Sequence, residues 1–284
     1  MSIYGLFNYL DFKQLSMKIK TAITLLLFAI VISVKAQGGQ EQWIKNGNRN
    51  IYGVLNIPED GKKKHPIAII SHGFNGTHFY GKNYFEPLAS LGYACYTFDF
   101  PCGSVNSKSD PNTMNMSVVD EQHDLEAIIK YFRQRKDIDK KNIVIIGESQ
   151  GGFVSAMTAA KRPKHVSKMI LAFPALCIPD NWNKRYPTLE SIPDTTRLWN
   201  VPMGRRFFQE LHHINVFNEI GKYKGPVLIV QGDKDQVVSM ADSQKAVEIY
   251  QNAKLHVIKG AGHGFKEQEL QEYFQQVSTF LKEP

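Results

Sequence analysis

The sequence has few cysteines, and this scarcity limits how covalent cross-links could hold the fold. Only three of its 284 residues are cysteines, Cys95, Cys102 and Cys177. Because the number is odd, at least one thiol stays free even if the protein is exported. The separation of Cys95 and Cys102 is compatible with one disulfide, whereas the setting of Cys95 is that of a strand residue packed as a small hydrophobe. The sequence therefore leaves the pairing of the thiols open.

The chain also lacks the patterns of metal sites and of nucleic-acid interfaces. No two histidines combine a metal-ligand spacing with acidic neighbours, and the adjacent His212 and His213 would point in different directions on a helix. The formal net charge is +7, but the lysines are scattered and form no stripe with interleaved aromatic residues. We therefore expect no metal, no cofactor and no nucleic-acid partner.

The amino end has the pattern of a secretory signal peptide. Basic residues after Met17 precede a short apolar run at residues 21–33, and Val34-Lys35-Ala36 resembles a cleavage site with a small last residue. The run is short for a transmembrane helix, and no lipobox cysteine follows it. We expect residues 1–36 to be an upstream extension and a signal peptide. The protein would then be exported, periplasmic or secreted, with no stable membrane insertion after cleavage; an uncleaved anchor is the alternative.

Residues 37–284 would form one domain of 248 residues. Its formal net charge would be +4, because the first 36 residues hold four basic residues and one acidic residue. Apolar runs alternate with helical stretches along this part, and the runs are continuous, as expected for parallel strands buried on both faces. The alternation predicts an α/β fold with a doubly wound, mostly parallel sheet. The predicted strands cover residues 42–45 and 50–57 as an antiparallel edge pair, then 67–71, 94–99, 143–146, 168–173, 226–231 and 255–258; the predicted helices cover 84–91, 118–133, 152–161, 241–251 and 267–282.

One stretch, about residues 174–224, interrupts this alternation. It separates two predicted strands by about fifty residues and contains several prolines and large aromatic residues. A structureless loop of this length is rare in a compact domain. We interpret the stretch as a small cap over the functional site, with Trp182, Trp199 and Phe207 as candidates for a substrate pocket. The alternative is an insertion with a purely structural role.

Ser149 lies in the sequence Gly147-Glu148-Ser149-Gln150-Gly151, between a predicted strand and a predicted helix. A serine on such a turn has a strained backbone, so the residues two before and two after it must be nearly free of side chain. Gly147 and Gly151 meet this demand. The context favours a nucleophilic serine over the alternative, a glycine-rich loop with a solvated serine.

An acid and a histidine that could serve this serine follow later in the chain. Asp235 lies in a charged turn after the seventh predicted strand, and His263 lies in a glycine-rich segment after the eighth. The order serine, acid, histidine is expected when the three side chains project from the carboxyl ends of successive parallel strands. Asp233 is the alternative acid, and we prefer Asp235 because the acid normally follows the turn.

The loop after the predicted strand 67–71 begins with His72-Gly73-Phe74. A glycine-bearing loop at this end of the sheet can aim a backbone N–H at a developing oxyanion. We expect the oxyanion hole to consist of the backbone N–H groups of Phe74 and Gln150. His72 is expected to shape the loop without transferring a proton.

Together these motifs resemble the α/β-hydrolase superfamily and, within it, the feruloyl (cinnamoyl) esterase-like acyl esterases. The likeness spans about residues 50–282, and the matching stretches are 72–76, 147–152, 232–238 and 260–265. The resemblance implies hydrolysis of carboxylic esters through an acyl-enzyme, with a cap that shapes the acyl pocket. Plant-derived phenolic or acetyl esters are the expected substrates. The chain departs from the family at Cys102, where a histidine is frequent, and this bears on substrate detail near that loop.

Two rival functions remain. A serine peptidase of the prolyl oligopeptidase type also carries its serine between such glycines. We expect no gating propeller within the 284 residues, and no acidic pair is evident for a substrate amino group. The other rival is a non-catalytic binding protein on the same scaffold, which is disfavoured because Ser149, Asp235 and His263 are all present.

Overall fold

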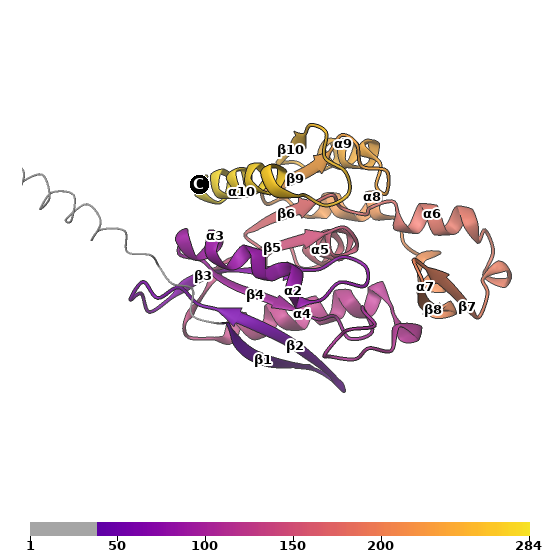
Figure 1. Ribbon diagram of the computed structural model, residues 1–284, viewed down its shortest axis with the longest axis horizontal. Helices are drawn as coiled ribbons and strands as arrows, with labels where there is room; N and C mark the ends of the chain where they lie inside the picture. Colours follow the sequence, from indigo (N-terminus) through magenta and orange to yellow (C-terminus); the bar gives the residue numbers. More distant parts are fainter. Residues whose placement is uncertain (1–38) are drawn as a thin grey trace, which may run out of the picture. The chain divides into compact units, whose positions relative to one another are not determined.

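The computed structural model describes residues 39–284, so the predicted upstream extension and signal peptide, residues 1–36, lie outside the described residues. The described part contains one large sheet in the order β1-β2-β4-β3-β5-β6-β9-β10 (Figure 1). The first two neighbouring pairs in this order are antiparallel and all others are parallel. Its strands are β1 (Gln40–Asn46), β2 (Arg49–Asn56), β3 (His65–Ser71), β4 (Ala94–Phe98), β5 (Ile138–Glu148), β6 (Lys168–Ala172), β9 (Val227–Gly232) and β10 (Ala253–Ile258). The prediction of a doubly wound, mostly parallel α/β sheet is confirmed.

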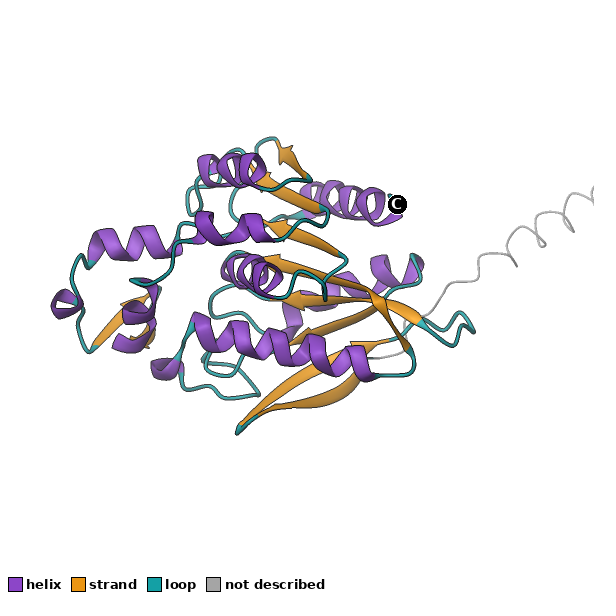
Figure 2. Cartoon of the chain, turned by 180° about the vertical axis from the view of Figure 1, so that it is seen from behind, coloured by secondary structure: helices purple, strands orange, loops and turns teal. Residues whose placement is uncertain are grey.

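Helices cover both faces of this sheet, because successive strand residues point to opposite sides. On one face Ile67 and Ile69 pack in the same apolar cluster as Leu125 of α4 (Val118–Gln134) and Val154 of α5 (Gln150–Lys161). On the other face Ala68 and Ile70 share a cluster with residues of α3 (Phe85–Ser90) and α10 (Glu267–Lys282). A fifth helix, α9 (Met240–Ile249), lies on the α4 side through Ala246. Figure 2 shows α4 and α5 in front of the sheet.

Helix α4 was predicted from the helical periodicity of its apolar residues, and the structure confirms it. Its buried residues include Leu125, Ile128, Ile129 and Phe132, which recur at helical spacing and form one face. The side chain of Ser117 accepts a hydrogen bond from the Asp120 backbone N–H and caps the first turn. A cap of this kind typically contributes about 1 kcal/mol to helix stability.

The predicted helix 84–91 is present as α3, but two short helices that were not predicted precede it, and one strand begins earlier than predicted; long-range contacts explain both differences. The predicted helix 84–91 is preceded by α2 (His78–Gly81) and a short 3-10 helix, η1 (Lys82–Tyr84), because the His78 backbone N–H donates to the buried Asp99 carboxylate at 2.6 Å. Strand β5 begins at Ile138, five residues earlier than predicted. Ile138 is buried and pairs with His65, but the four residues after it are polar, so no apolar run marked this part of the strand in the sequence.

The connection between β6 and β9 has its own secondary structure. A two-stranded antiparallel sheet pairs β7 (Thr195–Leu198) with β8 (Val201–Gly204), leaving Trp199 and Asn200 as a two-residue turn with φ of 49° and 67°. Positive φ at both central residues is the geometry that tight hairpins require. The helices of this segment are α6 (Ile178–Arg185), α7 (Arg205–Leu211) and α8 (Val216–Glu219), with short 3-10 helices η3 (Leu189–Ser191) and η4 (Ile220–Lys222).

The three cysteines are free and buried, so the disulfide left open by the sequence does not form between Cys95 and Cys102. Burial, with the neighbouring Asp110, raises the pKa of Cys102 to about 11. Among residues 39–284 no helix is both long enough and apolar enough to cross a membrane.

Candidate active site

Ser149 occupies a sharp turn between β5 and α5. Its backbone has φ 52° and ψ −117°, a strained conformation that costs about 1–3 kcal/mol and persists only where the surroundings enforce it. The Ser149 N–H donates to Ala172 O at 3.0 Å, which fixes the turn to β6. A methyl group on Gly147 would lie 2.3 Å from Gly151 O, so the turn depends on glycine there. The strained turn leaves Ser149 Oγ at the edge of two cavities.

His263 and Asp235 form a hydrogen-bonded line with Ser149. Ser149 Oγ lies 3.0 Å from His263 Nε2, and His263 Nδ1 lies 2.9 Å from Asp235 Oδ2. The Asp235 side chain is 1% exposed, and its other oxygen accepts from the N–H groups of Val237 and Val238 at 2.8 and 2.9 Å. A carboxylate with these partners can only accept from Nδ1–H, which leaves Nε2 as the acceptor for the serine proton.

The alternative acid, Asp233, is not in this line. Its carboxylate accepts from the Gly260 N–H at 2.6 Å and so ties the β9 turn to the loop that carries His263. The imidazole of His263 packs edge-on against Phe173, with ring centroids 4.9 Å apart. The loop thus has a polar and an aromatic support, and the histidine faces Ser149.

The loop after β3 passes directly beside Ser149. A methyl group on Gly73 would lie 3.1 Å from Ser149 Cβ. The backbone N–H groups of Phe74 and Gln150 donate no hydrogen bond within residues 39–284. Gln150 lines one of the two cavities beside Ser149 and Phe74 lines both, so two backbone donors near the hydroxyl are available to a ligand oxygen.

His72 fastens this loop, as the sequence led us to expect. Its ring is buried, Nδ1 donates to Gly73 O at 2.7 Å, and Nε2 accepts from the Phe100 N–H at 3.1 Å. Burial lowers the pKa of His72, which favours the neutral ring that this pattern needs. His72 therefore holds the carbonyl of Gly73 and, through it, the orientation of the next N–H.

Glu121 was missed by the sequence analysis. It lies on the buried face of α4 and receives hydrogen bonds from Gln150 Nε2 at 2.9 Å to both carboxyl oxygens. Burial raises the pKa of Glu121 to about 8, and nearby Asp124 adds to the effect. The signal available in the sequence was a glutamate at a position where the helical periodicity demands an apolar residue.

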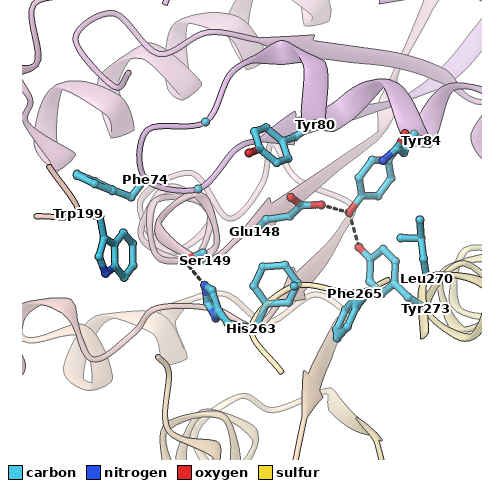
Figure 3. Close-up of a pocket in the computed structure, with 15 residues that line it drawn as sticks. Phe74, Tyr80, Tyr84, Glu148, Ser149, Trp199, His263, Phe265, Leu270 and Tyr273 are labelled. Carbon is cyan, nitrogen blue, oxygen red and sulfur yellow. Dashed lines mark hydrogen bonds between the residues drawn. The ribbon is translucent and has the colours of Figure 1, made fainter. Parts of the chain in front are cut away.

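Two cavities meet at Ser149. The first, of about 350 Å³, is lined by Ser149 and His263 together with Tyr80, Tyr84, Glu148, Phe265 and Tyr273 (Figure 3). The second, of about 260 Å³, is lined by Ser149 and Gln150 and by residues of the segment between β6 and β9. Of the predicted pocket residues, Trp182 and Phe207 line the second cavity and Trp199 lines both.

The first cavity contains a polar group that sequence analysis did not predict. Tyr84 Oη donates to Glu148 Oε1 at 2.7 Å and lies 2.8 Å from Tyr273 Oη. Because Tyr84 has a single hydroxyl proton, which goes to Glu148, the Tyr273 hydroxyl must donate to Tyr84. Burial raises the pKa of Glu148 to about 7. The three residues come from β5, η1 and α10, and no local pattern links them.

Residues 66–206 match the family model of the alpha/beta hydrolase fold. Among solved structures, the chain is similar to Est1E from Butyrivibrio proteoclasticus with ferulic acid bound, at a TM-score of 0.77 and 26% identity over 84% of this chain and 97% of that one. The fold and these matches make the chain a member of the α/β-hydrolase superfamily. Within it the chain is esterase-like and resembles feruloyl esterases.

Curated relatives match shorter parts of the chain. The abhydrolase domain-containing protein abhd-5.2 of Caenorhabditis elegans is 33% identical over 118 residues, which cover 40% of this chain and 24% of that protein. The proline iminopeptidase PfmaB of Pestalotiopsis fici is 30% identical over 128 residues, or 44% of this chain and 41% of that protein. An uncharacterized Mycobacterium tuberculosis protein, Rv2307c, is 23% identical over 70% of this chain and 63% of its own length. The chain thus spans less than two thirds of the length of these relatives.

Proposed function

We propose that the protein is a serine esterase that cleaves carboxylic esters through an acyl-enzyme intermediate. The observation that carries this proposal is the hydrogen-bonded line from Ser149 through His263 to Asp235, which opens onto two cavities. His263 accepts the Ser149 proton as Oγ attacks the ester carbonyl, and Asp235 stabilises the imidazolium. The resulting oxyanion is held by the N–H groups of Phe74 and Gln150; each such donor is worth about 3 kcal/mol of barrier.

The tetrahedral intermediate then collapses. The bond from the carbonyl carbon to the alcohol oxygen breaks, and His263 gives its proton to the departing alcohol. Water repeats the sequence: His263 takes a proton from water, hydroxide adds to the acyl carbon, and the Ser149 ester bond breaks with return of the proton to Oγ. The products are a carboxylic acid and an alcohol, and the enzyme is unchanged.

The lining of the second cavity suits an aromatic or aliphatic acyl group. Its walls include Ile178, Trp182, Phe207 and Val238 and are mostly apolar. Est1E, the similar protein, has been solved with ferulic acid bound. We infer that hydroxycinnamoyl and acetyl esters, as found in plant material, are suitable substrates, and that the signal-peptide pattern at residues 1–36 directs the enzyme out of the cytoplasm.

A serine aminopeptidase is the second candidate, and the 30% identity with the iminopeptidase PfmaB favours it. Hydrolysis of aminoacyl-p-nitroanilides would distinguish it from an esterase. We expect turnover of esters and none of these amides.

The direct test of the esterase proposal is Ser149→Ala. We expect it to abolish labelling by a fluorophosphonate probe and to lower hydrolysis of p-nitrophenyl acetate and methyl ferulate by about 10⁵–10⁶-fold, because no other group can form the acyl-enzyme. Circular dichroism should show an unchanged fold. The matched control is Ser90→Ala, a substitution of an exposed serine on α3. Wild-type rates in folded Ser149→Ala would refute the nucleophile.

A further inference from the structure

The first cavity has a hydrogen-bond acceptor to which none of residues 39–284 donates. The chain of hydroxyl groups runs from Tyr273 to Tyr84 to Glu148 Oε1, so this oxygen is already bonded. The other carboxyl oxygen, Oε2, receives no hydrogen bond from the described residues. Figure 3 shows it turned toward Tyr80, on the opposite side from the bond to Tyr84. The two tyrosines therefore hold the carboxyl group in one orientation with one oxygen available.

The position of His263 indicates which half of an ester enters this cavity. His263 lines only the first cavity and Gln150, the expected oxyanion donor next to Ser149, only the second, whereas the other expected donor, Phe74, lines both. In the proposed reaction the imidazole returns its proton to the departing alcohol, so the alcohol leaves on the side of His263. The acyl group then extends into the second cavity, and the alcohol lies in the first.

We propose that the first cavity is the binding site of the leaving alcohol, and that Glu148 selects alcohols that carry a further hydroxyl group, whose O–H donates to Oε2. This inference rests on the proposed esterase function. The rings of Tyr80 and Phe265, which also line the cavity, provide apolar surface for the carbon skeleton of such a polyol. No lysine or arginine among residues 39–284 lines the cavity, so an anionic alcohol would face the Glu148 carboxyl group with no compensating lysine or arginine from this part of the chain.

A hydroxyl group suits this acceptor better than an ammonium group does. With its pKa raised to about 7 by burial, Glu148 is present in both protonation states near neutral pH. A hydroxyl can bond to either form, because it both donates and accepts. A cationic group, whether it donates an N–H or, as in a quaternary ammonium, acts through its charge alone, needs the ionised carboxylate, so its binding would be lost as pH falls through 7.

The test compares esters that share one acyl group and differ only in the alcohol. For the purified enzyme we would measure kcat/KM for glyceryl monobutyrate, propyl butyrate and butyrylcholine, which present hydroxyl groups, no polar group and a cation. We expect the glyceryl ester to be preferred over the propyl ester by about tenfold, equivalent to about 1.4 kcal/mol, because only the glyceryl ester can donate a hydrogen bond to Oε2. Glu148→Met should reduce this ratio to near one. The matched control is Glu86→Met, which alters an exposed glutamate on α3 and should keep the wild-type ratio.

A second variant keeps the test decisive if Glu148→Met does not fold. Tyr84→Phe keeps the carboxyl group but removes the hydroxyl that orients it, and it should lower the ratio by a smaller factor. An unchanged ratio in folded Glu148→Met, or in folded Tyr84→Phe if the first variant does not fold, would overturn the inference.

The wild-type enzyme separates this inference from the esterase proposal. Equal kcat/KM for the glyceryl and propyl esters, with normal fluorophosphonate labelling, would sink the alcohol site and leave the esterase intact. No labelling and no turnover of any ester would sink the esterase proposal itself. A preference for butyrylcholine over the glyceryl ester would show that the cavity selects a cation, and would also overturn the assignment.

Discussion

The two cavities beside Ser149 share Phe74, Ser149 and Trp199, but the rest of their walls comes from different parts of the chain. The walls of the first come mainly from the β3 loop with α2 and η1, the end of β5, the loop of His263 and α10, and the Tyr84 hydroxyl links Glu148 to Tyr273 by hydrogen bonds. The walls of the second come mainly from the segment between β6 and β9, with Trp182 and Phe207, and are mostly apolar. One proposed reaction centre therefore serves two sites of unlike chemistry. Selectivity for the acyl group and for the alcohol can then change independently.

After the loss of the Ser149 hydroxyl itself, the largest effect should come from another change that both cavities share. Asp235→Asn should lower kcat by about 10³–10⁴-fold for every ester, whatever its acyl or alcohol group, because the amide no longer holds the His263 tautomer that accepts from serine. Rates with glyceryl monobutyrate, propyl butyrate and methyl ferulate would measure this. The control is Asp233→Asn, which keeps an acceptor for the Gly260 N–H and should stay close to wild type.

Unequal losses among the three esters would break the comparison. They would mean that the two cavities do not share one reacting centre. Full activity of Asp235→Asn together with a large loss in Asp233→Asn would reverse our assignment of the acid.

A smaller effect, confined to one cavity, should follow Trp182→Ala. Trp182 lines the second cavity and packs edge-on against Phe208 at 4.7 Å between ring centroids. Its loss removes apolar contact with a long or aromatic acyl group, worth about 1–3 kcal/mol, or roughly ten- to a hundredfold in kcat/KM. Methyl ferulate hydrolysis should fall by this factor, p-nitrophenyl acetate much less, and the ratio of glyceryl to propyl butyrate should not change.

The control for this variant is Trp43→Ala, which removes an exposed tryptophan of β1. A change in the glyceryl to propyl ratio of Trp182→Ala would show that the two sites are coupled. An equal loss on acetate and ferulate would show that the tryptophan supports the fold rather than the acyl group.

The two sides of Ser149 also differ in how far sequence could predict them. Ser149, Asp235 and His263 are each marked by a nearby glycine and by an apolar strand just before, and the strand ends of a parallel sheet meet at one edge; this is why the sequence could predict that they meet. Their catalytic roles stay predictions. By contrast, Tyr84 is 64 residues from Glu148 and 189 residues from Tyr273 in the sequence. Only the packing of α10 and η1 against the end of β5 brings them together, and no local periodicity encodes it.

The segment between β6 and β9 shows the same limit. The long gap between strands predicted that the segment would have secondary structure of its own, and its aromatic content drew attention to Trp182, Trp199 and Phe207, whereas its role as a cap stays a prediction. At the centre of the hairpin β7-β8 only Asn200 is a usual turn residue, because a tryptophan rarely adopts the positive φ that Trp199 has. Sequence therefore did not indicate that Trp199 would lie at the tip of a hairpin and line both cavities.

The smallest expected effect is on thermal stability and comes from a comparison of two glutamates: Glu148, which directly precedes Ser149, and Glu121, which is bonded to the residue that follows it. Glu148 faces a cavity, whereas Glu121 is enclosed and bonded to Gln150. Burial raises the pKa of Glu121 from 4.5 to about 8, so the folded state favours the protonated carboxyl. The contribution of Glu121 to the free energy of unfolding is complete below about pH 4.5 and is lost as pH rises through 8.

Glu121→Gln resembles the protonated form and should escape this loss. Relative to wild type, its Tm should rise between pH 5.5 and 8.5 by about 3–6 °C, equivalent to roughly 1–2 kcal/mol. The control is Glu248→Gln at an exposed position, which should keep the wild-type dependence of Tm on pH. If Tm depends on pH in the same way for Glu121→Gln and wild type, Glu121 is ionised in the folded protein over this range. Gln150 would then be bonded to a full negative charge beside the proposed oxyanion hole.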